Sequence, residues 1–67
     1  MNADWQPRLI EERGDLFDRM SRLNSFIHSA EFSAVTSEER KRIKKQYRFM
    51  TGYLTALNER IAVSDID

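Results

Sequence analysis

The sequence predicts an all-α fold, an antiparallel hairpin of two helices that assembles into an oligomeric helical bundle. Three observations lead to this prediction. Apolar residues recur at helical spacing in two long segments, a short segment separates the two, and apolar positions cover more than one face of each long segment. A chain of 67 residues forms one domain at most, so we expect a single helical-hairpin domain over residues 1–67.

The first helix is expected over about residues 4–30. One apolar stripe runs along it, formed by Leu9, Leu16, Met20, Leu23 and Ile27. Ile10, Phe17 and Phe26 widen this stripe beyond a narrow seam. Pro7 lies in the first turn, where its missing N–H removes no intrahelical hydrogen bond.

The second helix is expected over about residues 37–63. Its apolar residues step alternately by four and three positions, which is the heptad spacing of a coiled coil. They are Ile43, Tyr47, Met50, Leu54, Leu57 and Ile61. Thr36 followed by Glu39 matches a capping box, which places the start of this helix at Ser37.

The connection between the helices is expected to be a loop over residues 31–36. Phe32 and Val35 are its apolar residues, and we expect them to fill the end of the hairpin. A turn centred near residue 33 places Met20 opposite Tyr47.

Two glycines lie inside the expected helices, where glycine costs roughly 0.5–1 kcal/mol relative to alanine. The same turn places Gly14 level with Gly52 and Tyr53. Two explanations remain open. Either the backbone of another subunit or a ligand approaches closely at this level, or both are tolerated surface glycines.

Self-association is expected because one hairpin cannot bury two apolar faces on each helix. The second face consists of Ile10, Phe17, Phe26, Phe49 and Tyr53. Chains this short bury only about 60% of the surface that they expose when unfolded, and they usually need a disulfide, a metal or a partner subunit. The chain has no cysteine and a single histidine, His28, so we expect no disulfide, no metal and no other cofactor. A homo-oligomer is the remaining means of stabilisation.

A basic cluster opens the second helix in a chain of zero formal net charge. It consists of Arg40, Lys41, Arg42, Lys44, Lys45 and Arg48, with no acidic residue among them. The first turns of a helix carry the positive end of its dipole, which disfavours basic side chains and attracts anions. Arg19 and Arg22 come alongside from the first helix. The cluster therefore favours an anionic ligand, with Lys41, Lys44, Lys45 and Arg48 as phosphate-binding residues.

Two other readings of this cluster stay open. It is also explained by an ordinary solvated face, in which Asp15–Arg19, Asp18–Arg22 and Glu38–Arg42 pair at i, i+4. An acidic protein partner is the second alternative. Nucleic acid is a weaker candidate partner, because the net charge is zero.

Catalysis and membrane insertion are not indicated. The chain has no glycine-rich phosphate loop, no Ser/His/Asp set and no metal-ligand spacing, so we expect no catalytic residues and no enzyme activity. We read His28 as a partner of the dipole at the end of the first helix. No apolar run approaches the roughly 20 residues of a membrane span, and the N-terminus lacks the pattern of a signal peptide. These features predict a cytoplasmic protein without a membrane partner.

A family resemblance rests on spaced residues between about Arg8 and Ala62. In the first helix and the loop that follows it they are Glu12, Leu16, Arg19, Leu23, Phe26, Ile27, Ser29 and Phe32, and in the second helix Gln46, Met50, Tyr53, Leu57, Arg60 and Ile61. In these residues the chain resembles small uncharacterised phage and prophage proteins described as related to a crAss-like phage protein. The resemblance implies a phage origin, hence the host cytoplasm, and a two-helix fold.

These observations lead to a functional hypothesis. Several small phage proteins oligomerise into cages that hold nucleotide immune signals, and a basic oligomer is similar in kind, by analogy alone. We expect a phage accessory, anti-defence protein that sequesters an anionic, nucleotide-like ligand in pockets between subunits. The candidate ligand-binding residues are Arg19, Arg22, Lys41, Lys44, Lys45, Arg48, Gln46, Tyr53 and Arg60. The alternative is a helical module that inhibits or bridges a host protein through the second apolar face.

Overall fold

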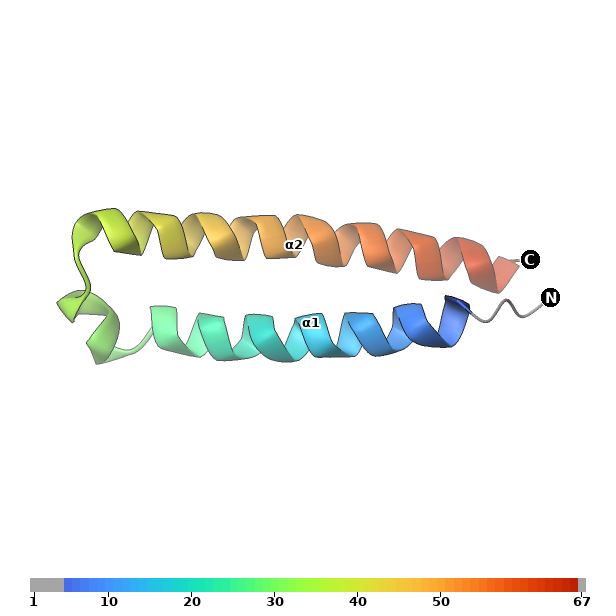
Figure 1. Ribbon diagram of the computed structural model, residues 1–67, viewed down its shortest axis with the longest axis horizontal. Helices are drawn as coiled ribbons and strands as arrows, with labels where there is room; N and C mark the ends of the chain where they lie inside the picture. Colours follow the sequence, from blue (N-terminus) through green and yellow to red (C-terminus); the bar gives the residue numbers. More distant parts are fainter. Residues whose placement is uncertain (1–4, 67) are drawn as a thin grey trace.

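The structure is a hairpin of two long antiparallel helices. The computed structural model describes residues 5–66, and the side chains of residues 6–63. Helix α1 spans Trp5–Ile27, the short 3₁₀ helix η1 spans Ala30–Ala34, and α2 spans Ser37–Ile66. The two long helices lie side by side with η1 at one end (Figure 1). The prediction of an all-helical fold with two helices packed against each other is confirmed.

The path between the helices differs from the expected loop. Helix α1 ends at Ile27, three residues before the expected end at residue 30, and residue 4 lies outside the described residues. Beyond Ile27 the hydroxyl of Ser29 donates to the Phe26 carbonyl at 2.6 Å, and the chain tightens into η1. Local side-chain hydrogen bonds of this kind compete with helix propagation.

Phe32 fills the end of the hairpin. Its side chain is buried, and its ring meets that of Phe26 edge to face, with 5.7 Å between the ring centroids. Val35, three residues later in the sequence, is half-buried. The connecting segment is therefore held by an aromatic pair as well as by its backbone turns.

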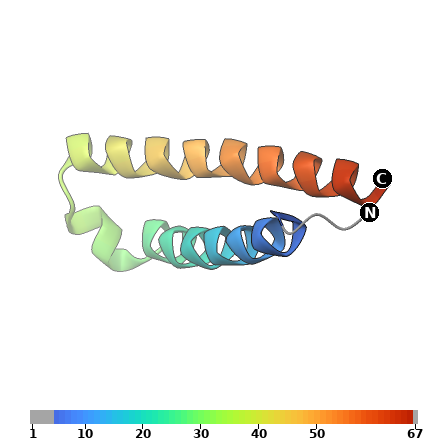
Figure 2. The same cartoon turned by 45° about the vertical axis from the view of Figure 1, so that its right-hand side comes forward.

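Helix α2 begins at Ser37 and continues to Ile66, three residues beyond the expected end at residue 63. The N–H of Glu39 donates to the hydroxyl of Thr36 at 3.3 Å, which satisfies one free amide of the first turn. Figure 2 shows the same pair of helices turned by 45°, and α2 extends along the whole of α1 in both views.

The core is one narrow seam between α1 and α2. Its buried residues are Leu9, Leu16, Met20, Leu57 and Ile61, with Tyr47, Met50 and Leu54 partly buried against them. Leu57 is the most enclosed side chain, with 1% of its surface exposed. The heptad-spaced apolar residues of α2 and the apolar stripe of α1 thus face each other.

The register of the two helices is close to the expected one. Tyr47 packs against the buried cluster that contains Met20, and Gly14 lies beside Leu54 and Asn58. The long side chain of Arg13 donates to the side-chain oxygen of Asn58 at 3.1 Å, one turn beyond residue 54, which a turn at residue 33 places opposite Arg13.

The hairpin leaves much surface uncovered. Its radius of gyration is 15.4 Å, against about 11 Å for a compact chain of this length. Its accessible surface is 5254 Å², against about 4,450 Å² for a compact monomer of this mass. None of the described helices combines the length and the apolar character that crossing a lipid bilayer requires.

Candidate functional site

One face of the hairpin carries a groove between α1 and α2, which we call the central groove. It is lined by Arg19, Arg22, Leu23, Phe26, Gln46 and Met50. Both arginines come from α1, and Gln46 and Met50 come from α2 across the seam. The groove therefore has an apolar floor and a basic edge.

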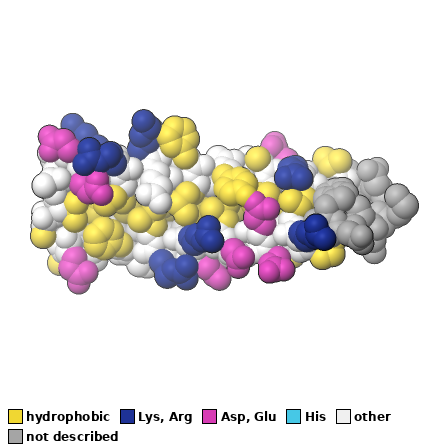
Figure 3. All heavy atoms as spheres, in the orientation of Figure 1, with side chains coloured by type: hydrophobic (Ala, Val, Ile, Leu, Met, Phe, Trp, Pro, Cys, Tyr) yellow, Lys and Arg dark blue, Asp and Glu magenta, His cyan; other side chains and the backbone are white. Residues whose placement is uncertain are grey.

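A second hollow adjoins the central groove on the side of α2. It is lined by Arg42, Lys45, Gln46, Phe49, Met50 and Tyr53. Gln46 and Met50 belong to both hollows, so the two form one continuous surface. Figure 3 shows hydrophobic side chains in a band along the length of the hairpin, with basic and acidic side chains at its edges.

The groove continues toward the start of α1 with a different charge. There Arg19 and Tyr53 meet a mixed set of Arg8, Glu11, Glu12, Asp15 and Leu16. The carboxylates repel an anion, whereas the end of the groove at Arg22 attracts one. The charge thus changes along the groove from acidic beside Glu12 to basic beside Arg22.

Arg19 and Arg22 are free to bind an anion. Within the described residues, neither guanidinium forms a hydrogen bond or an ion pair. The expected i, i+4 pairs with Asp15 and Asp18 are therefore absent. Exposed pairs of this kind are worth little against the side-chain entropy that they cost, so their absence has a simple physical reason.

The basic cluster of α2 is divided among several contacts. Arg40 donates to the carbonyls of Ser33 at 3.1 Å and Val35 at 2.6 Å, so it holds the turn. Arg42 pairs with Glu39 at 2.7 Å, one residue from the expected partner Glu38.

The remaining basic residues of the cluster point in different directions. Lys44 lies 5.8 Å from the centre of the Phe32 ring, at the end of the hairpin. Lys45 and Arg48 lie 5.8 and 5.9 Å from the ring centre of Phe49. Lys41 is exposed and lines neither hollow that contains Gln46.

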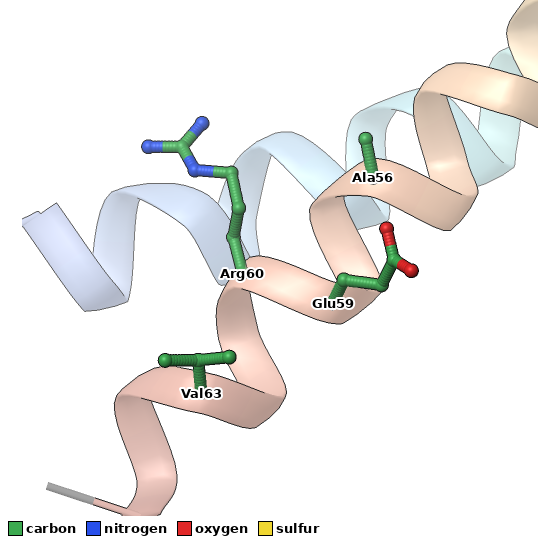
Figure 4. A pocket seen from close by; sticks show the side chains of 4 residues that line it. All are labelled: Ala56, Glu59, Arg60 and Val63. Carbon is green, nitrogen blue, oxygen red and sulfur yellow. The ribbon is translucent and has the colours of Figure 1, made fainter.

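Arg60 lies in a separate hollow toward the end of α2, which we call the distal hollow. It is lined by Ala56, Glu59, Arg60 and Val63. Figure 4 shows these four side chains on successive turns of α2, with the ribbon of α1 behind them. At 1.5 Å per residue, Arg60 is about 21 Å along the helix from Gln46.

One chain thus brings together five of the nine candidate residues, namely Arg19, Arg22, Lys45, Gln46 and Tyr53. It does not bring Lys41, Lys44, Arg48 or Arg60 into this group. The apolar floor of Leu23, Phe26 and Met50, with the exposed ring of Phe49 beside it, was absent from the predicted site. Its signal in the sequence is the position of Phe49 one turn from Tyr53, outside the heptad seam.

The opposite face of the hairpin is different in character. Its hollow is lined by Arg13, Gly14, Phe17, Asp18, Leu54 and Asn58. A Cβ atom at Gly14 or at Gly52 would meet no other part of the hairpin within 4 Å. Packing within one chain therefore requires neither glycine.

Comparison with known proteins assigns the chain to a family. The sequence profile of the Sequestin family matches residues 3–63. The family name is consistent with a sequestering role that implies binding of some ligand, and it suggests a binding protein, not a catalyst. The matched family is described as Sequestin and not as related to a crAss-like phage protein. No curated protein and no solved structure matches the chain. The match covers nearly the whole sequence, and the chain therefore belongs to the Sequestin family.

Proposed function

We propose that this protein sequesters an anionic, nucleotide-like ligand in basic pockets that its homo-oligomer forms between subunits, as an accessory protein with which a phage counters host defence. The observation that carries the proposal is the pairing of two unengaged guanidinium groups, Arg19 and Arg22, with an apolar floor and an exposed aromatic ring. The family name supports sequestration, and the resemblance to phage proteins supports the origin.

Each part of a nucleotide finds a suitable group in this groove. Guanidinium groups bind phosphate through two parallel hydrogen bonds, which suits Arg19 and Arg22. The ring of Tyr53 is 45% exposed, and such a ring supports stacking of a base. The side-chain amide of Gln46 both donates and accepts hydrogen bonds, so it suits the edge of a base. Lys45 adds a further positive charge beside Gln46.

Sequestration needs no reacting group, which agrees with the chemistry of the groove. The binding groups are guanidinium, ammonium, amide and phenol, and together they provide charge, hydrogen bonds and a stacking surface. Under this proposal the protein lowers the concentration of the free signal by binding it, and the bound signal stays chemically unchanged. Release of unchanged ligand from denatured protein follows as a direct consequence.

The experiment measures binding and identifies the bound molecule. Protein purified from infected or defence-expressing cells is denatured, and the released small molecules are identified by mass spectrometry. Purified protein is also tested by calorimetry against cyclic dinucleotides and ADP-ribose derivatives. Arg22→Ala is expected to weaken binding at least tenfold, because a charge-assisted hydrogen bond is worth about 1.5–3 kcal/mol.

The matched control compares two lysines of the same helix. Lys45→Ala removes a charge beside Gln46, whereas Lys41→Ala removes the same charge outside the groove. The first is expected to weaken binding and the second to change it by less than a factor of two. Protein that releases no small molecule and binds none of the panel would refute the proposal.

A second candidate function is favoured by the exposed aromatic residues. Phe49 is 64% exposed and Phe17 is 58% exposed, on two different faces. A helical module that inhibits or bridges a host protein uses such residues as anchors. In that case Phe49→Asp abolishes activity in infected cells, whereas charge reversal at Lys44 and Lys45 preserves it. Ligand sequestration predicts loss of activity on reversal of Lys45.

A further inference from the structure

Helix α2 carries a second heptad stripe beside the seam that packs on α1. We call it the outer seam, and it consists of Gln46, Phe49, Tyr53, Ala56, Arg60 and Val63. These residues step by three, four, three, four and three positions, the spacing of a helix-packing surface. Its large apolar members Phe49, Tyr53 and Val63 are 64, 45 and 61% exposed. Helix α1 therefore does not cover the outer seam.

The other flank of α2 shows that this stripe is not a general property of the helix. It carries Lys44, Arg48, Thr51, Thr55 and Asn58, all polar and exposed. The hydroxyls of Thr51 and Thr55 donate to carbonyls four residues earlier, at 3.1 Å each. One flank of α2 is thus suited to water and the other to a packing partner.

The elongated shape of the hairpin exposes more surface than a compact chain of its size. With extents of 50 × 15 × 14 Å, the chain exposes about 800 Å² more than a compact monomer of its mass. A stable interface of standard size buries about 800 Å² per partner. A second copy of this chain provides a matching surface, because a two-fold axis brings the same stripe to both sides.

The charges of the outer seam select an antiparallel arrangement. Lys45 and Arg42 flank its first half, and Glu59 flanks its second half. Parallel helices would place Lys45 beside Lys45 of the partner subunit, which is repulsive. Antiparallel helices place both Glu59 and Arg60 of the partner subunit near Lys45, so that the attraction of Glu59 offsets the repulsion of Arg60.

The sizes of the side chains along the outer seam indicate where the two-fold axis between the two copies lies. Phe49 projects from the outer seam, and the distal hollow at Ala56 lies two turns further along α2. An axis midway between them, beside Gly52, places each Phe49 over Ala56 of the partner subunit. The same axis brings Gly52 of one subunit close to Gly52 of the partner subunit, and no other part of the hairpin lies within 4 Å of a Cβ atom at this glycine. Large residues then oppose small ones.

We propose that two copies of the chain pair antiparallel along the outer seam of α2, with Phe49 of each copy in the distal hollow of the other. This pairing gives Gly52 a function that the single hairpin lacks, since a glycine permits the closest approach of two helices. It also explains the placement of Arg60. Arg60 of the partner subunit comes level with Lys45 and Gln46, at the side of the groove.

The pairing completes the basic pocket from two chains. Arg19, Arg22, Lys45 and Gln46 come from one copy, and the partner subunit's Arg60 closes the side of the hollow. This consequence rests on the proposed function, whereas the pairing itself rests on the seam, the charges and the exposed area. The two are therefore tested separately.

Sedimentation equilibrium of the full chain tests the pairing. Phe49→Asp is expected to raise the dissociation constant of the dimer by at least about a hundredfold, because each copy loses a buried aromatic ring. Phe17→Asp is the matched control, with a similar exposure on α1, and leaves the constant within about threefold. Circular dichroism of both variants establishes that the helices persist. A monomeric native chain, or greater disruption by Phe17→Asp, overturns the proposal.

Cross-linking tests the direction of the pairing in a chain that has no native cysteine. Gln46→Cys and Arg60→Cys are prepared as separate variants and oxidised alone and mixed. Antiparallel pairing gives a disulfide-linked dimer in the mixture and little in either variant alone. Parallel pairing gives linked dimers in each variant alone, and that result overturns the proposal.

Ligand measurements separate this proposal from the proposed function. Arg60→Ala is expected to keep the dimer and to weaken nucleotide binding at least fivefold. A dimer that forms and binds no nucleotide leaves the pairing intact and refutes the proposed function. A monomeric variant that binds nucleotide as tightly as the native chain refutes the completion of the pocket by the partner subunit.

Discussion

Leu57 is the side chain on which the packing of this small core depends most. It is 1% exposed and contacts the seam between α1 and α2. Leu57→Ala removes its buried methyl groups and leaves a cavity, which costs about 2–5 kcal/mol. At about 0.05–0.15 kcal/mol per residue, a chain of 67 residues has a total free energy of unfolding of roughly 3–10 kcal/mol. The substitution therefore removes a large fraction of the stability.

Urea denaturation followed by circular dichroism at 222 nm measures this loss of stability. All variants are measured at the same protein concentration, because subunit association adds to the apparent stability. Leu54→Ala is the control, since Leu54 is the same residue type one turn earlier and only partly buried. We expect it to cost less than half as much as Leu57→Ala. Equal losses would refute the reasoning, because they would show that burial within one hairpin does not determine the contribution of each leucine.

Two further predictions concern the turn and the glycines. Arg40→Ala removes two hydrogen bonds to the carbonyls of Ser33 and Val35. We expect the free energy of unfolding, measured by thermal denaturation, to fall by about 1–2 kcal/mol. An unchanged melting temperature would show that the turn is held without Arg40. Gly14→Ala and Gly52→Ala both replace open helical glycines and are each expected to stabilise the helix by about 0.5–1 kcal/mol. Only Gly52→Ala is expected to weaken dimerisation in sedimentation equilibrium, and equal effects of both substitutions would contradict an axis beside Gly52.

The residue types of the candidate site were predictable from the sequence, but which of these residues lie together was not. The basic cluster was read as one unit, yet Arg40 holds the turn, Arg42 pairs with Glu39, and Lys44 lies over Phe32. Each of these contacts depends on where the turn and its neighbours lie. Charge density along a sequence does not contain that information, because side chains of successive residues point to different sides of a helix.

The apolar floor of the site was missed for a related reason. Phe49 and Met50 were assigned to self-association or to the core, whereas both line the hollow that contains Lys45 and Gln46. An aromatic residue outside a heptad seam indicates a second surface. Its spacing alone does not distinguish a subunit interface from a ligand groove.

The sequence by itself determined that the chain is helical, that two helices pack through one seam, and that apolar surface remains outside it. These properties follow from residue periodicity, which is local and repeats along many turns. Only the tertiary structure decided which cations meet at the groove. The aromatic pair of Phe26 and Phe32 lies where η1 joins the two helices, and the length of this connection affects their register. A small change of register preserves the apolar seam while it changes the polar neighbours across it.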